Sequence, residues 1–267
     1  MTPLRTRALG WMLALGGLAT SAAAPAEAAT LKVLGWNDLG MHCMDADYSV
    51  FSILPPFNNL HAQVIDTTNN KLLTSGVTVS FEATADLNGS VNSYSVGKTN
   101  FWDYSKALFG VDLQPGVGLA GFQTAGMTPQ ALGFDSGLSM FAAPGVPITP
   151  FDDRGVHNTY PMTKVVVRDT GGNALASASV VLPVSDEMTC VACHASGSDA
   201  DAKPPVHGWV WDLRSPDKDF RRNALALHDD LQMGNKKFVK ALKTMGYDPK
   251  GLLATADGGR QIGRAHV

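Results

Sequence analysis

The residue types best suited to chemistry in this chain lie in one short stretch, Cys190-Val191-Ala192-Cys193-His194. The pattern is C-x-x-C-H. Thiols three residues apart can reach the two vinyl groups of a porphyrin and form thioether bonds, and the histidine that follows can donate a ring nitrogen to the iron. The spacing therefore predicts a covalently attached haem, with Cys190 and Cys193 as its anchors and His194 as the proximal iron ligand.

The same two thiols allow other chemistry. They can form a disulfide, act as a thioredoxin-like redox pair, or supply half of a zinc site. A thioredoxin-like pair needs a βαβ setting, which the sequence does not indicate. A closed zinc site needs two more ligands, and the only further thiol is that of Cys43, next to His42. The histidine directly after the second cysteine favours haem over these alternatives.

With this motif the chain resembles the c-type cytochromes, although the resemblance covers the motif and not the whole chain. It implies one covalent haem c and a role in electron transfer. A second resemblance lies in the segment from Trp36 to Asp45, WNDLGMHCMD, and in the residues from Tyr48 to Pro56 that follow it. This segment is similar to the opening of uncharacterised exported bacterial proteins that end in C-x-x-C-H segments. It supports a cytochrome c-like protein and implies no particular reaction.

The N-terminus has the features of an export signal. Arg5 and Arg7 precede an apolar run over 8–19, and Ala26-Glu27-Ala28 fits the A-x-A cleavage pattern. The apolar run is shorter than the roughly 20 residues that a comfortable membrane span requires. We therefore expect a signal peptide over 1–29 and a mature chain without a membrane span. Its expected location is the periplasm, since bacteria attach c-type haem outside the cytoplasm.

The composition is that of an ordinary globular protein, with 45% hydrophobic and 17% charged residues and a net charge of -3. So small a charge gives no reason to expect nucleic acid or an anionic membrane as a partner. The expected partners are redox proteins of the periplasm. Three cysteines are too few for a disulfide framework, and the odd one, Cys43, has no obvious partner.

Alternation of apolar and polar residues predicts a mainly β, sandwich-like region over 30–185. The clearest signals are a strand over 77–83 and a hairpin whose strands, 163–168 and 178–182, flank a glycine-rich turn. Between 111 and 160 glycine and proline are frequent and periodicity is weak. We expect an irregular stretch there, which either covers a cofactor face or is a surface excursion.

Beyond the motif the pattern changes to that of helices. Ser215-Pro216-Asp217 is typical of a helix start, and the apolar stripe that follows predicts a helix to about Gln232. A second helix is expected over 235–245. The expected fold is thus a mainly β (sandwich-like) N-terminal region followed by a loop and an α-helical c-type haem segment, with the haem-attachment segment over 186–260.

The last residues, 261–267, match what a common sequencing-library adapter encodes in frame. We interpret them as a non-native tail. On this hypothesis the natural chain continues past Arg260 and has room for further haem motifs.

A six-coordinate haem needs a second axial ligand, usually methionine or histidine. His228 on the first predicted helix is the leading candidate for this distal ligand, with a neighbouring carboxylate to orient it, and the alternative is an exposed helical histidine. His207, between two prolines and a tryptophan, is a weaker candidate. Met41 and His42 are also weaker candidates for the distal ligand. They lie beside Cys43 in a cluster of soft or borderline ligands, which could bind copper instead.

A covalent haem allows three kinds of function. An electron carrier sets its potential through the axial ligand, burial and nearby charge. The second possibility is a haem oxidoreductase or peroxidase-like enzyme, which needs an open coordination site on the distal side of the iron and polar groups beside it. The third is a haem- or copper-dependent sensor module. We expect the electron carrier, because no catalytic triad or phosphate-binding loop is visible in the sequence. The sequence predicts neither the redox partner nor the potential nor a substrate.

Overall fold

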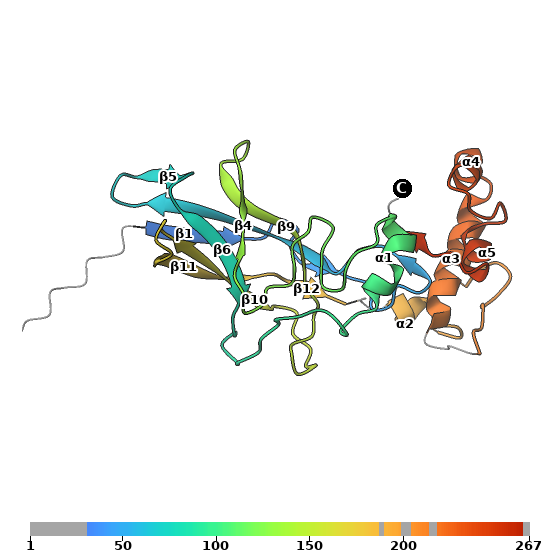
Figure 1. Ribbon diagram of the computed structural model, residues 1–267. Helices are drawn as coiled ribbons and strands as arrows, with labels where there is room; N and C mark the ends of the chain where they lie inside the picture. The colour runs from blue at the N-terminus through green and yellow to red at the C-terminus, as the bar shows by residue number, and fades with distance from the viewer. Residues whose placement is uncertain (1–30, 187–189, 199–203, 214–217, 264–267) are drawn as a thin grey trace, which may run out of the picture.

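The computed structural model describes residues 31–186, 190–198, 204–213 and 218–263 (Figure 1). The expected signal peptide and the expected helix start at Ser215 lie outside these ranges. Within them, no helix is long and apolar enough to cross a membrane. A β-sandwich occupies one end of the molecule, and the C-terminal helices gather at the other end (Figure 1).

The first sheet is organised around one long strand, β4. Strand β1 pairs antiparallel with one edge of β4, while β9 and β5 pair with successive parts of its other edge, and β8 continues the sheet beyond β9. The strands are β1 (Leu31–Trp36), β4 (Phe57–Asp66), β5 (Lys71–Leu73), β8 (Gly133–Asp135) and β9 (Met140–Pro147).

The second sheet is also antiparallel and has the strand order β11-β10-β6-β7. Its strands are β6 (Thr78–Ala83), β7 (Gln130–Ala131), β10 (Met162–Arg168) and β11 (Ala174–Val181). Alternate side chains of the two sheets meet in one hydrophobic core, in which Leu60 and Val64 of the first sheet join Phe81 and Val165 of the second. Burial of these β-branched and aromatic side chains is the main stabilising contribution to the sandwich.

The stretch over 111–160 is more regular than expected, because it contains β8 and β9 as well as β7. Pro144 and Gly145 interrupt the alternation of β9, and the pairing of β9 with β4 shifts register opposite them. The Asn59 side chain fills the gap by accepting a hydrogen bond from the Gly145 N–H at 2.9 Å. A strand with such a bulge gives little periodic signal in the sequence.

Two short parallel pairs tie the sandwich to the C-terminal part of the chain. β2 (His42–Cys43) pairs with β12 (Val184–Ser185), the last strand before the C-x-x-C-H motif, and β3 (Phe51–Ser52) pairs with β13 (Ile262–Gly263). Part of the expected non-native tail therefore lies in a strand, and its residues 264–267 lie outside the described ranges. Helix α1 (Phe101–Phe109) packs beside these strands in an aromatic cluster with Tyr48 and Phe57.

The remaining helices are α2 (Cys190–His194), α3 (Asp219–Gln232), α4 (Lys236–Thr244) and α5 (Leu252–Asp257). α4 begins at Asn235, whose side chain accepts a hydrogen bond from the Lys237 N–H, as an N-cap does. The buried Asp229 of α3 accepts hydrogen bonds from the N–H groups of Leu252 and Leu253, which fixes the start of α5 against α3.

The fold class expected from the sequence is wrong. The chain is mostly antiparallel β-sheet with only about 20% helix, and its described residues form no helical haem segment of the kind a helical c-type cytochrome has. The motif itself occupies a helix of five residues, after which the chain turns at 195–198. The expectation failed for a physical reason. The C-x-x-C-H spacing requires only one turn of helix, so the motif does not determine how the helices after it pack, and α3 packs against α5 as well as against α2.

Candidate functional site

The three motif side chains share one face of α2. Because an α-helix turns by about 100° per residue, positions i, i+3 and i+4 lie above one another, and these are Cys190, Cys193 and His194. Both cysteines are exposed and neither is in a disulfide, and His194 is half-buried. Among the described residues no hydrogen bond or ion pair engages the His194 ring. The local helix thus presents two accessible thiols and an imidazole in one direction.

A buried asparagine on α3 fixes the backbone at the end of α2. Asn223, which is 1% exposed, donates hydrogen bonds to the His194 carbonyl oxygen and to the Ser196 hydroxyl oxygen, both at 2.9 Å. Its side-chain oxygen accepts the Val210 N–H at 2.7 Å. One side chain therefore joins the motif, the turn after it and the loop over 204–211. This arrangement holds the backbone of His194 in place.

Apolar side chains are exposed around the motif. Val191, within α2, is 52% exposed, and Trp211 is 61% exposed. The Trp211 ring lies against the turn after α2, because a Cβ placed on Gly197 would meet its edge at 3.2 Å. Large apolar groups exposed beside two thiols and an imidazole are a surface that a flat, apolar porphyrin would cover. The residues present therefore fit a covalent haem.

The β2–β12 pair brings the cluster around Cys43 to the segment that leads into the motif. Cys43 lies opposite Ser185, and Met44 is buried with Val184 beneath the pair. The His42 ring contacts the Pro55 carbonyl oxygen at 2.7 Å through Nε2, and the Met41 side chain is 40% exposed. Of the weaker candidate ligands, His42 thus lies on the strand that neighbours the approach to α2, and Met41 lies directly before that strand.

The loop that follows β2 docks on the first turns of α3. The carboxylate of Asp47 accepts hydrogen bonds from Asn100 at 2.6 Å and from the Ser49 hydroxyl at 2.7 Å, and pairs with the Lys218 ammonium at 3.2 Å. Burial alone would raise the pKa of Asp47, but these hydrogen bonds outweigh it and lower the pKa to about 2. The buried Arg221 guanidinium donates to the Asp47 carbonyl oxygen. These contacts position α3, and through Asn223 they position the motif.

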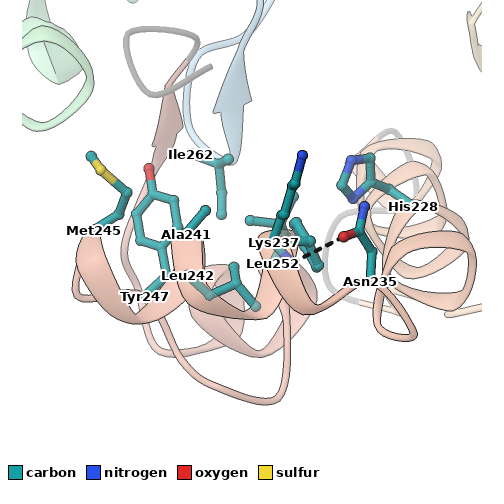
Figure 2. A pocket seen from close by; sticks show the side chains of 10 residues that line it. His228, Asn235, Lys237, Ala241, Leu242, Met245, Tyr247, Leu252 and Ile262 are labelled. Atoms are coloured by element: carbon teal, nitrogen blue, oxygen red, sulfur yellow. Dashed lines mark hydrogen bonds between the residues drawn. The ribbon is translucent and has the colours of Figure 1, made fainter.

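His228, the leading candidate for the distal ligand, lies on another face of α3. Five residues separate it from Asn223, which places the two side chains about 140° apart around the helix. The His228 ring packs edge-on against Phe238 of α4, with 5.2 Å between ring centroids, and lines a cavity with no motif residue in it (Figure 2). The structure does not bring His228 together with His194.

His207 also lies away from the motif histidine. It is exposed in a turn closed by a hydrogen bond from the Gly208 N–H to the Pro205 carbonyl oxygen at 2.8 Å. The neighbouring Val206 N–H donates to the Asp230 carboxylate, which fixes this turn to the solvent side of α3. In the described part of the chain, no group of three or more His, Cys, Asp and Glu side chains could hold a metal ion.

Sequence reasoning missed Asn223, Arg221 and Trp211, because each acts through a contact with a residue distant in the chain and none belongs to a short motif. One indirect signal was available in the first predicted helix. Its buried residues include the polar side chains of Arg221 and Asn223 as well as apolar ones. A buried polar residue in such a helix requires a partner.

Comparisons with protein-family models, with curated proteins and with solved structures found no match to this chain.

Proposed function

We propose that this chain is a periplasmic haem c protein that binds one haem covalently through Cys190 and Cys193, with His194 as the proximal iron ligand, and transfers electrons to and from periplasmic redox proteins. The observation that carries the proposal is the common face of α2, on which two exposed thiols and an imidazole lie at positions i, i+3 and i+4. The β-sandwich then serves as the scaffold that presents this short helix.

The chain's own residues have distinct tasks in this proposal. The two thiols anchor the group, so that it cannot escape in an open compartment. Asn223 orients the backbone of His194, and Val191 and Trp211 exclude water from the porphyrin face. When bound, the haem supplies a reversible one-electron couple, whose potential depends on the second axial ligand and on burial.

The placement of the other candidates favours the β2 side for the second axial ligand. His42 and Met41 lie on or beside the strand that pairs with the approach to the motif, whereas His228 and His207 lie elsewhere on α3. Replacing His42 and Met41 separately by alanine, and following the low-spin absorption of the holoprotein, tests this choice. The His228→Ala variant is the control and should retain the wild-type spectrum.

Covalent attachment is tested by expression with a c-type haem maturation system. The wild type is expected to gain the mass of one haem and to show a haem c pyridine haemochrome spectrum. Cys190→Ala and Cys193→Ala should each lose a thioether bond, and the double variant should lose all covalent haem. Cys43→Ser is the matched control, since Cys43 is the one cysteine outside the motif, and it should keep the haem. Colourless wild-type protein with the mass of the bare chain would contradict the proposal.

A further inference from the structure

A cavity of about 380 Å³ lies among the C-terminal helices (Figure 2). α3 contributes His228 to its wall, α4 contributes most of the remaining lining, and Leu252 of α5 and Ile262 of β13 close it. Its volume is within the range of small-molecule sites in proteins. Apart from Ile262, every described lining residue precedes the expected non-native tail.

The floor of this cavity is apolar. Phe238, Leu242 and Met245 project into it from one side of α4, and Tyr247 and Leu252 face them. Leu242 is 2% exposed and Tyr247 is 8% exposed, so both are firmly packed. Water in such a space has few hydrogen-bond partners, and an apolar group displaces it at a gain.

The mouth of the cavity is polar and positively charged. Figure 2 shows the side chains of His228, Asn235 and Lys237 side by side at one end of the opening. Among the described residues, no acidic side chain lines the cavity and no carboxylate pairs with the Lys237 ammonium. The two neighbouring acids of α3 are engaged elsewhere, Asp229 with the start of α5 and Asp230 with the Val206 N–H.

We propose that this cavity binds a small amphipathic anion, an aliphatic or aromatic carboxylate, with its apolar part on the α4 floor and its carboxylate between Lys237 and His228. The ammonium supplies the charge and the imidazole supplies an N–H donor. The site is separate from the haem motif, because no motif residue lines it and His228 and Asn223 point to different sides of α3. It does not depend on the proposed electron-transfer function.

Decanoate, used below its micellar concentration, is the probe. Isothermal titration of the mature protein, with whatever cofactor it carries, should show saturable binding with one site. Decanol, which has the same chain without the charge, and acetate, which has the charge without the chain, should both bind far more weakly. Lys237→Gln should weaken decanoate binding about fivefold, the effect of one partly exposed charge.

Two matched variants separate the cavity from the general basic surface of α4. Lys236→Gln removes the adjacent charge, which lies outside this cavity, and should leave the affinity for decanoate unchanged. Ala241→Trp fills the cavity from an exposed position and should abolish binding, whereas Thr244→Trp adds the same ring on α4 outside the lining and should not. The thermal midpoint of each variant checks that it is folded.

Three results would overturn the proposal. The first is an absence of saturable decanoate binding by the wild type. The second is that the Lys236→Gln and Lys237→Gln variants lose binding equally, whether the probe is decanoate or anionic vesicles. Such a result would indicate a charged surface instead of a pocket. The third is a change in the haem spectrum of His228→Ala, which would assign this histidine to the iron.

Discussion

Asn223 is the residue whose side chain most directly supports the backbone of the C-x-x-C-H motif. Its side chain satisfies the His194 carbonyl, the Ser196 hydroxyl and the Val210 N–H, and it is 1% exposed. An alanine there would remove the partner of the His194 carbonyl oxygen and of the Val210 N–H in a place that water reaches poorly, whereas the Ser196 hydroxyl would keep its hydrogen bond to the Val210 carbonyl oxygen. Each buried group left unsatisfied costs about 1–3 kcal/mol.

We therefore expect Asn223→Ala to lower the free energy of unfolding by about 2–4 kcal/mol and to alter the haem environment of the holoprotein. Asn223→Asp retains the acceptor for the Val210 N–H but sets a buried carboxylate against the His194 carbonyl oxygen, so at neutral pH it should alter the haem environment and lose at least as much stability as the alanine variant. Urea unfolding and the midpoint potential measure the two effects. A wild-type potential in both variants would show that Asn223 has a structural role alone.

At this scale the sequence offers a hypothesis about the chemistry, but it does not indicate which residues support the motif. The motif is recognisable because Cys190, Cys193 and His194 lie within five consecutive residues and their spacing matches the reach of two thioether bonds. Asn223 acts 29 residues further along the chain, and only the folded backbone brings it to His194. His228 was an attractive ligand because it lies beside an apolar stripe, but a stripe identifies the buried side of a helix and not the element that covers it.

Among the elements, β1 and β11 meet more closely than any sequence pattern indicates. A Cβ placed on Gly35 of β1 would lie 2.3 Å from a methyl group of Val180 on β11, in the core between the two sheets. A glycine in a strand interior often marks such a close approach. The missing side chain at Gly35 lets the first and second sheets approach along this edge.

Gly35→Ala is expected to destabilise the sandwich by about 1–3 kcal/mol through overpacking, measured by urea unfolding. Val180→Ala in the same chain should recover part of this loss, because it removes the opposing methyl group. Gly133→Ala in β8 is the control, since its Cβ would meet nothing closer than 3.8 Å, and it should be nearly neutral. Equal effects at Gly35 and Gly133 would refute the close approach.

Elements with strong local patterns were predicted well. The hairpin of β10 and β11 and the strand β6 lie where alternation and the glycine-rich turn placed them. Strand β9 was not predicted, because Pro144 and Gly145 break the alternation of apolar and polar residues. Helix α1 was not predicted, because the polar Ser105 lies among its buried positions with Phe101 and Leu108. The expected helical haem segment was wrong because a motif of one helical turn does not specify the fold around it.

For the whole molecule, the decisive contact is the loop between β2 and β3, which joins the sandwich to α3. Arg221 is buried there between the rings of Phe51 and Phe220. Beside it, Asp47 pairs with Lys218 at the start of α3 and accepts a hydrogen bond from Asn100, the N-cap residue of α1. The carboxylate of Asp47 thus connects the start of α3 with the start of α1.

This connection makes stability depend on pH. Because the folded state lowers the pKa of Asp47 from 3.8 to about 2, the stabilisation is fully present above about pH 4 and is lost as the pH falls toward 2. Asp47→Asn should reduce the free energy of unfolding by at most about 2 kcal/mol at pH 7. The difference from wild type should shrink between pH 4 and pH 2 in urea titrations.

Asp112→Asn provides the matched control for Asp47→Asn. Asp112 also pairs with a lysine, Lys106, at 3.4 Å, but both side chains are 75% exposed, so the loss should stay below about 0.5 kcal/mol at every pH. If Asp47→Asn lowers the free energy of unfolding by the same amount at pH 7 and at pH 2, the packing of the side chain and not its ionisation is what stabilises the fold. If the ionisation of Asp47 matters, acid should loosen the contact of α3 before it unfolds the sandwich core. Asn223 and His194 would move with α3. The absorption of the proposed haem should therefore change at a higher pH than the far-ultraviolet signal of the sheets.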